Sequence, residues 1–242
     1  MMTRIGNSLF RYRNGLFPLA YLLLFAKDRL VTVHYEAAAL AGFAIALAGQ
    51  FLRAATIGLD YIIRGGKNRQ VYAERLVTGG LFAHCRNPLY VGNFLVLVGL
   101  GVASCSVVFL LGVIPFFIFA YAAIIAAEEA FLRDKFGAEF DAYCACVNRI
   151  VPNFSGLSAT LSGMGYNWRR LITAEYGATA AWLTGMILVT LHNVWLAGDF
   201  EKRRPLVIFL GALLVAVGLA YCVARFLKKT GRLASPARFA QP

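Results

Sequence analysis

The sequence predicts an all-α integral membrane protein with about six transmembrane helices and one further helix in the cytoplasmic interface. Three observations support this fold class. Of the 242 residues, 60% are apolar and 15% are charged, whereas soluble domains are about 45–50% apolar and about 25% charged. Several stretches with few or no charges approach or exceed the roughly 20 residues that a helix needs to cross a bilayer. The basic residues gather in alternate loops between these stretches, a pattern typical of segments that face the cytoplasm.

Two predicted spans lie in the N-terminal membrane segment, residues 1–70. The first covers residues 14–26, which are uncharged but number only 13. The second covers residues 37–59 and contains a single charge, Arg53, near its end.

The central segment, residues 71–155, contains a long uncharged stretch. Residues 87–127 include no charge over 41 positions, which is about twice the length of one span. We therefore expect a hairpin of two helices that turns near residues 104–106. Pro115 is expected to bend the second arm, because proline interrupts the helical hydrogen bonds.

A helix in the interface is predicted directly after this hairpin. Apolar residues recur there every three or four positions, which is the spacing of one helix face. They are Leu132, Phe136, Phe140, Tyr143 and Val147. We expect one continuous helix that rests this face on the bundle and ends at Pro152.

The C-terminal segment, residues 156–242, consists of a linker and two predicted spans at residues 176–198 and 205–224. With six spans and a cytoplasmic N-terminus, 19 of the 24 Lys and Arg residues fall on the cytoplasmic side. This distribution predicts that both termini are cytoplasmic, in the inner membrane if the source is bacterial.

The charge and the cysteines exclude other classes of protein. The net charge of +12 is interpreted as attraction to anionic lipid, because no aromatic-interleaved basic stripe or nucleic-acid motif is present. The five cysteines lack the spacing of a zinc site. We expect neither a metal centre nor a nucleic-acid partner.

Polar residues whose side chains could bind a ligand or take part in a reaction gather on the predicted cytoplasmic face. They lie in residues 64–88 and 128–152, which flank the hairpin, so Arg86 and Glu128 return to similar depths. A carboxylate pair, an arginine and a histidine suit a zwitterionic cofactor such as S-adenosylmethionine. Carboxylates bind its ammonium and ribose hydroxyls, and an arginine binds its carboxylate.

These residues also form an ordered motif. The chain reads Leu76-Val77-Thr78-Gly79-Gly80-Leu81-Phe82, then Arg86-Asn87-Pro88-Leu89-Tyr90-Val91-Gly92, Glu128-Glu129, Phe136-Gly137, Phe140, Tyr143 and Pro152. Over residues 76–154 it resembles the integral-membrane methyltransferases that include isoprenylcysteine carboxyl methyltransferases and phospholipid N-methyltransferases. Asn87 stands where the carboxyl methyltransferases have histidine, so the motif leaves the acceptor open.

The resemblance implies a cofactor, an acceptor and a set of site residues. The cofactor is S-adenosylmethionine, and the acceptor is a lipid or a lipidated small molecule in the membrane. The implied catalytic residues are Arg86, Asn87 and Tyr90. The implied cofactor-binding residues are His84, Arg86, Pro88, Tyr90, Gly99, Gly101, Glu128 and Glu129.

Several of these residues also have a structural interpretation. Asn87 and Pro88 are typical of the start of a helix, and Gly99 and Gly101 of close helix packing. His84 could act as a base or be an ordinary interfacial histidine. Neighbouring residues point about 100° apart on a helix, so only one of Glu128 and Glu129 is expected to touch the ligand.

Other functions and the assembly remain open. A phospholipid N-methyltransferase is the alternative within the same family. A nicotinamide-dependent membrane lipid reductase and a non-catalytic membrane protein are the alternatives outside it. The sequence does not define the oligomeric state.

Overall fold

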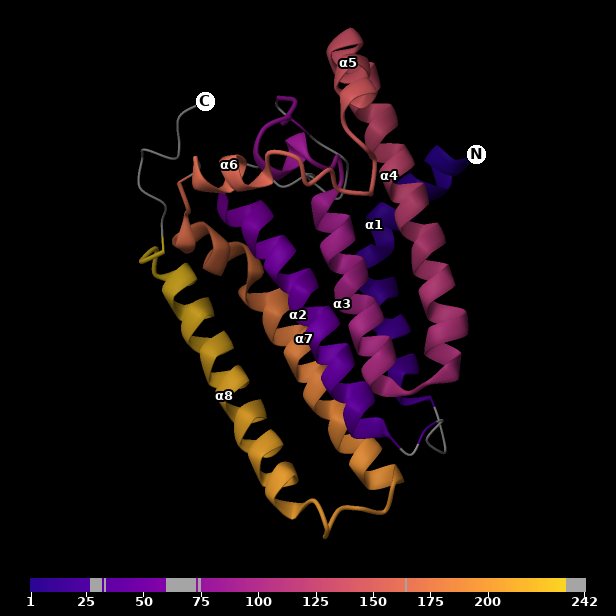
Figure 1. Ribbon diagram of the computed structural model, residues 1–242, viewed down its shortest axis with the longest axis vertical. Helices are drawn as coiled ribbons and strands as arrows, with labels where there is room; N and C mark the ends of the chain where they lie inside the picture. The colour runs from indigo at the N-terminus through magenta and orange to yellow at the C-terminus, as the bar shows by residue number, and fades with distance from the viewer. Residues whose placement is uncertain (27–31, 33, 60–72, 74, 164, 234–242) are drawn as a thin grey trace.

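The computed structural model describes residues 1–26, 32, 34–59, 73, 75–163 and 165–233. Among these residues every regular element is helical, and six long helices run alongside one another (Figure 1). These are α1 (Met2–Tyr21), α2 (Tyr35–Leu59), α3 (Pro88–Ser104), α4 (Ile114–Phe136), α7 (Trp168–Leu196) and α8 (Arg204–Lys229). The shorter elements are the 3-10 turns Leu22–Phe25 and Gly80–Ala83, the π turn Phe109–Val113, α5 (Ala138–Cys146) and α6 (Leu157–Ser162).

The all-α membrane fold predicted from the sequence is confirmed. Four helical stretches are long and apolar enough to cross a bilayer: Tyr35–Gly58, Phe109–Phe136, Trp168–Leu196 and Arg204–Lys229. Helix α3 is apolar but shorter. Helix α1 has 20 residues and begins well before the predicted span, so residues 14–26 form only its second half and the turn that follows.

The predicted hairpin is formed by α3 and α4. Cys105 makes the turn in the left-handed conformation, with φ of 51°. The hydroxyl group of Ser104 caps the end of α3 by donating to the carbonyl oxygen of Gly101, at 2.8 Å. Pro115 follows the π turn Phe109–Val113 directly within one continuous helical stretch, Phe109–Phe136. The irregularity of this arm is the π turn next to the proline, and the bend at Pro115 stays a prediction.

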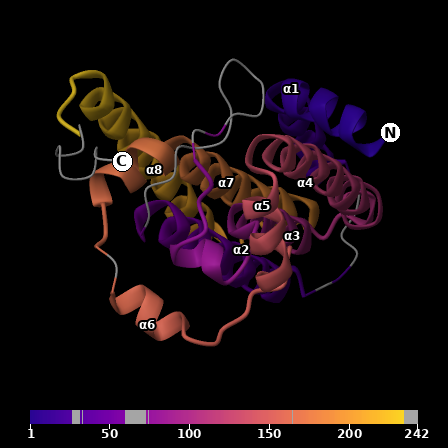
Figure 2. The same cartoon turned by 90° about the horizontal axis from the view of Figure 1, so that it is seen from above.

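Small residues bring α2 and α3 into close contact. A Cβ atom at Gly99 would collide with the backbone of α2 at Gly42 and Ala46, and one at Gly92 would meet the side chain of Arg53. Removing side chains from a crossing point lets two membrane helices approach closely. Helix α1 approaches α4 in the same way through Gly6, and Figure 2 shows these two helices side by side.

The prediction of one continuous interfacial helix up to Pro152 is wrong in two respects: the helix is interrupted at Gly137, and α5 ends at Cys146. Helix α4 continues to Phe136, Gly137 then adopts a φ of 51°, and α5 begins at Ala138. A positive φ interrupts a right-handed helix and suits glycine. Helix α5 extends past the end of the bundle (Figure 1). Its predicted apolar face is confirmed at Phe140, which is 1% exposed.

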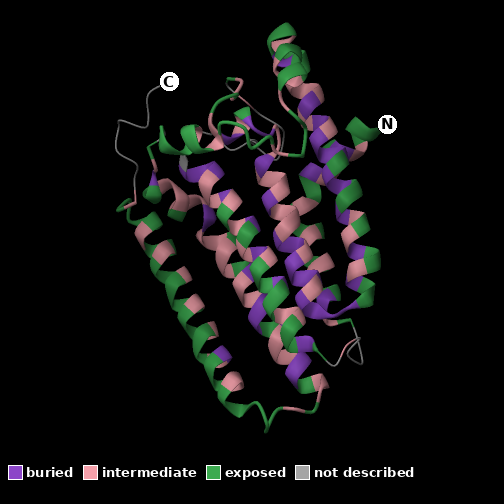
Figure 3. Ribbon diagram, in the orientation of Figure 1, coloured by how far each residue is buried: buried purple, intermediate pink, exposed green. Residues whose placement is uncertain are grey.

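Helix α8 lies at the edge of the bundle. It packs on α7, and Leu210 is the one residue of this helix that is buried. Figure 3 shows its outer surface as exposed along its length. These side chains are mostly apolar, as expected for a helix that faces lipid.

Candidate functional site

A cavity of about 1090 Å³ opens between the helices. Its walls come from α1, α2, α3, α4 and α7, with α5 at one end. The end near α5 is polar, with Arg13, Gln50, Arg53, Arg86, Asn87, Tyr90, Asn93, Glu128 and Glu129. The deeper part is apolar, with Phe17, Leu22, Leu24, Phe25, Val96, Leu100 and Leu188. Small-molecule pockets measure about 300–1,000 Å³, so this cavity slightly exceeds the usual range.

Glu129 holds two arginines at the polar end. Its carboxylate lies 3.2 Å from Nη1 of Arg86 and accepts from Nε and Nη2 of Arg149 at 3.1 and 2.5 Å. Nη1 of Arg86 also donates to the thiol sulfur of Cys144 at 2.7 Å. Nε of Arg86 is buried and has no hydrogen-bond partner among the described residues. Glu129 is therefore engaged by the protein, whereas Arg86 keeps one unused donor.

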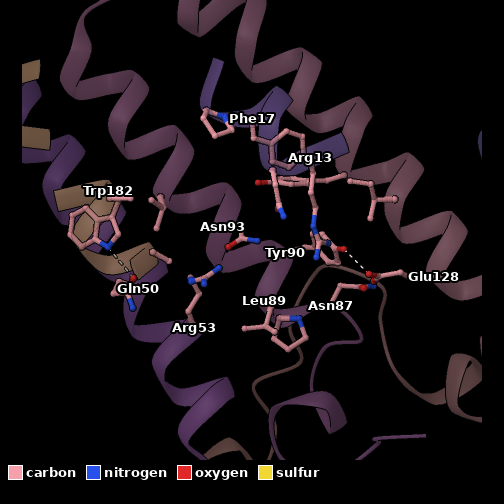
Figure 4. Close-up of a pocket in the computed structure, with 18 of the residues that line it drawn as sticks. Arg13, Phe17, Gln50, Arg53, Asn87, Leu89, Tyr90, Asn93, Glu128 and Trp182 are labelled. Carbon is pink, nitrogen blue, oxygen red and sulfur yellow. Dashed lines mark hydrogen bonds between the residues drawn. The ribbon is translucent and has the colours of Figure 1, made fainter. Parts of the chain in front are cut away.

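Glu128 is in a different environment, although it is adjacent in sequence. The hydroxyl group of Tyr90 donates to its Oε1 at 2.9 Å (Figure 4). No cationic side chain among the described residues lies within 4 Å of this carboxylate, and Oε2 has no protein donor there. Glu128 thus keeps a carboxylate oxygen for a ligand.

A network of hydrogen bonds fixes the loop that carries Arg86. The backbone N–H of Arg86 donates to the carbonyl oxygen of Asn148 at 2.9 Å. The thiol group of Cys85 donates to the carbonyl oxygen of Ile150, and the side chain of Asn87 to that of Arg149. Burial raises the pKa of the Cys85 thiol, so this thiol stays protonated and available as a donor. The start of α3 is thereby tied to the chain after α5.

Asn87 occupies the N-cap position of α3, with Pro88 as the first helical residue, as predicted. Its side chain makes no capping hydrogen bond. It donates instead to the Arg149 carbonyl oxygen at 3.0 Å, so Asn87 joins two segments that border the cavity.

A buried ion pair forms another part of the cavity wall. Nε and Nη2 of Arg53 donate to the carboxylate of Glu175 at 2.6–2.8 Å, and both side chains are almost fully buried. On the next turns, Nε1 of Trp182 donates to Oε1 of Gln50 at 2.9 Å. Both contacts join α2 to α7. The sequence signalled only Arg53, as a lone charge in an apolar stretch, because its partner lies 122 positions away.

The cavity is open sideways between α1 and α7. Asn14, Pro18 and Leu22 line the cavity from α1 and the turn after it, yet they are exposed on the surface. Ala178, Ala181 and Leu188 do the same from α7. Residues that border a cavity and are also exposed mark its opening. The opening faces the side of the bundle, where lipid surrounds a membrane protein.

The structure brings six of the predicted site residues together. Arg86, Asn87, Pro88, Tyr90, Glu128 and Glu129 all line the cavity. Arg13, Gln50, Arg53, Asn93, Tyr121 and Trp182 line it as well, and the sequence motif did not include them.

The other three predicted residues lie away from the cavity wall. The ring of His84 bonds to the carbonyl oxygen of Asn153 at 2.7 Å and to the hydroxyl group of Thr160 at 2.9 Å. His84 thus holds α6 and the segment before it. Gly99 packs on α2, and a Cβ atom at Gly101 would meet Phe109 at 3.0 Å. Both glycines therefore have a packing role here.

Within the described part of the chain, no group of three or more His, Cys, Asp and Glu side chains is placed to hold a metal ion.

The comparisons with known proteins agree with the motif. Residues 37–139 match the family described as phospholipid methyltransferase. This range includes α3, α4, all but the first two residues of α2 and the start of α5, and therefore most of the polar end of the cavity.

Two curated proteins have similar sequences. The nickel-cobalt-cadmium resistance protein NccN of Alcaligenes xylosoxydans xylosoxydans is 34% identical over 133 residues, which is 51% of this chain and 59% of that protein. The cobalt-zinc-cadmium resistance protein CzcN of Cupriavidus metallidurans is 36% identical over 93 residues, 38% of this chain and 40% of that protein. The chain thus spans less than two thirds of the length of either relative. No solved structure matches.

Proposed function

Because residues 37–139 match the family described as phospholipid methyltransferase, we propose that this chain transfers a methyl group from S-adenosylmethionine to a lipid-borne acceptor. One observation carries the proposal. A single cavity joins a charged end, which contains the family motif, to an apolar part that opens toward the bilayer. The two substrates differ in polarity in the same way.

The donor set at the polar end fits the cofactor. Glu128 offers an unused carboxylate oxygen to an ammonium group or to ribose hydroxyls. Arg86 lines the same end of the cavity and offers its guanidinium group to a carboxylate. Glu129 is occupied by two arginines, which supports the expectation that only one of the two glutamates binds the ligand.

When bound, S-adenosylmethionine supplies a methyl group on a sulfonium, which leaves as a neutral thioether. The chain then has to orient the substrates and exclude water, and such positioning can account for much of the catalysis. Arg86, Asn87 and Tyr90 lie together at the start of α3, and we assign them to this task. Tyr90 is held by Glu128 at 2.9 Å.

The acceptor is proposed to enter from the bilayer through the opening between α1 and α7. On the α7 side of this opening, Ala178 and Ala181 have small side chains, which leave room for a chain to pass. From Pro88 to Leu100 the cavity follows α3 for about 18 Å, at about 1.5 Å per residue. That depth accommodates part of an acyl or isoprenyl chain.

The proposal favours a reaction like that of isoprenylcysteine carboxyl methyltransferases, with phospholipid N-methylation as the alternative. The family match favours methyl transfer over the hydride transfer of a nicotinamide-dependent reductase and over a non-catalytic protein. The names of the two relatives suggest metal resistance as the physiological setting, and they leave the methyl acceptor unnamed.

The experiment uses the purified protein, S-adenosylmethionine with a radiolabelled methyl group, and extracted membrane lipids. We expect label in the organic phase with the wild-type protein. A folded protein that transfers no label to any lipid fraction would contradict the proposal.

A further inference from the structure

We infer that Arg13 of α1 binds the anionic group of the lipid-borne acceptor. This inference rests on the proposed function and assigns a residue to the recognition of its acceptor. Arg13 lies outside residues 37–139, the part of the chain that matches the family, and it lines the cavity. The acceptor would therefore be recognised by a helix that the family motif does not include.

Arg13 forms no direct ion pair with a carboxylate among the described residues. Its guanidinium group lies 3.9 Å from the ring centroid of Phe10. Among the described residues no carboxylate oxygen lies within 4 Å of it, and it makes no hydrogen bond there. The other two cationic groups discussed in this wall are paired, Arg53 with Glu175 and Arg86 with Glu129. A half-buried and unpaired cation attracts an anionic ligand.

The position of Arg13 places this charge beside the reaction site. Figure 4 shows it between Phe17 and Tyr90. Its charge acts on both Tyr90 and Glu128, although it touches neither. A ligand group bound by Arg13 would therefore lie beside the Tyr90–Glu128 pair, in the cavity that all three residues line.

Along the cavity-facing side of α1, the environment changes from polar at Arg13 to apolar in the turns that follow. Arg13, Phe17 and Tyr21 are spaced by four residues, so they lie on one face of the helix, and all three line the cavity. Phe17 packs on Phe117 and Tyr121, with ring centroids 4.6 and 5.9 Å apart. A charged head at Arg13 and a chain along these rings describe an anionic amphiphile.

Arg86 is less suitable for this role. It is held by Glu129 and Cys144, and its free Nε is buried at the end of the cavity near α5. Arg13 lies on the wall that borders the lateral opening, next to Asn14. We therefore assign Arg86 to the cofactor and Arg13 to the acceptor.

The test measures amphiphile binding without cofactor. Trp182 lines the cavity, and the other two tryptophans, Trp168 and Trp195, are about two thirds exposed. In a Trp168→Phe/Trp195→Phe background, a brominated chain that enters the cavity quenches Trp182. The probes are dibromostearate, which is anionic, and its neutral methyl ester. Displacement by unbrominated stearate or stearyl phosphate shows whether a carboxylate or a phosphate is preferred.

We expect dibromostearate to quench Trp182 at a concentration about tenfold lower than its ester, as for one charge-assisted contact. Arg13→Gln is expected to abolish this preference, and Arg13→Lys to restore part of it. Arg11→Gln is the matched control, because Arg11 is exposed on the same helix and does not line the cavity.

Equal quenching by the two probes in the wild-type protein would overturn the inference, as would an unchanged preference in Arg13→Gln. A loss of S-adenosylhomocysteine binding in Arg13→Gln, with the stearate preference intact, would assign Arg13 to the cofactor instead. Failure of the wild-type protein to bind cofactor would contradict the proposed function, and it would leave the quenching result interpretable.

Discussion

The neighbouring residues Glu128 and Glu129 have different partners because they point to different sides of α4. Glu129 is 9% exposed and pairs with Arg86 and Arg149. Glu128 meets only Tyr90 among the described residues. We expect Glu129 to stabilise the polar end of the cavity and Glu128 to be available to a ligand.

This difference predicts opposite results for two conservative changes. Glu129→Gln leaves two guanidinium groups without a carboxylate, one of them largely buried, and should lower the free energy of unfolding by about 2–3 kcal/mol. Glu128→Gln keeps an oxygen that accepts from Tyr90, and should change it by less than about 0.5 kcal/mol. Thermal unfolding in detergent measures both. Equal loss in the two variants would argue against the separation.

At the scale of the helices, the crossing of α2 and α3 places Arg53 and Tyr90 in the walls of one cavity. The crossing depends on Gly99, which has the backbone of α2 at Gly42 directly beside it. Gly211 on α8 has open space around the position of a Cβ atom, so it provides a matched comparison.

Gly99→Ala should destabilise the protein by about 1–3 kcal/mol, because the added methyl group forces the two helices apart. Gly211→Ala should cause no loss, because the methyl group meets nothing. The measurement is again thermal unfolding, together with the quenching of Trp182 as a report on the cavity. Tolerance of both substitutions would contradict the close crossing.

The elements that sequence predicted well are those whose signal is local. The hairpin follows from a long uncharged stretch with a polar turn at Ser104 and Ser106. The errors arise where the conformation of one residue, or a partner distant in the sequence, determines where a helix begins or ends. Gly137 divides the predicted interfacial helix through its positive φ. Helix α7 begins at Trp168, eight residues before the predicted span, with Asn167 as its N-cap, and the charge of Glu175 inside it is paired with the distant Arg53.

The candidate site follows the same rule: the residues of the local motif were predicted, and those from distant helices were not. Arg86, Tyr90 and Glu128 belong to one ordered motif, and the hairpin brings them together. Arg13 and Trp182 line the same cavity from helices that the motif does not include. Their contribution depends on how α1 and α7 pack on the central helices, which no local pattern encodes.

For the whole molecule, the basic residues are distributed unequally between the two ends of the bundle. At the end of the bundle opposite α5, the described basic residues are Lys202, Arg203 and Arg204, where α7 connects to α8. The end near α5 has most of the other described Lys and Arg residues, from Arg4 and Arg86 to Lys229. The positive-inside rule therefore supports a cytoplasmic polar end, as the sequence predicts.

Labelling with a membrane-impermeant maleimide tests this orientation. In a background with all native cysteines replaced by serine, a cysteine at Lys202 should react in intact cells. A restored Cys146, which is exposed on α5, should react only after the cells are permeabilised. The reverse pattern would place the polar end of the cavity outside the cytoplasm.

The central claim is that this cavity transfers a methyl group to a lipid, and Glu128 offers its sharpest test. The most direct measurement follows the radiolabelled methyl group from S-adenosylmethionine into extracted lipid with three proteins: wild type, Glu128→Gln and Glu139→Gln. Glu139 is exposed on α5 and does not line the cavity, so its variant controls for the loss of one negative charge. We predict transfer by the wild-type and Glu139→Gln proteins, and at least a tenfold loss in Glu128→Gln, about 1.4 kcal/mol of transition-state stabilisation. Equal transfer by all three proteins would contradict the role of Glu128, and no transfer by any folded protein would contradict the proposed function itself.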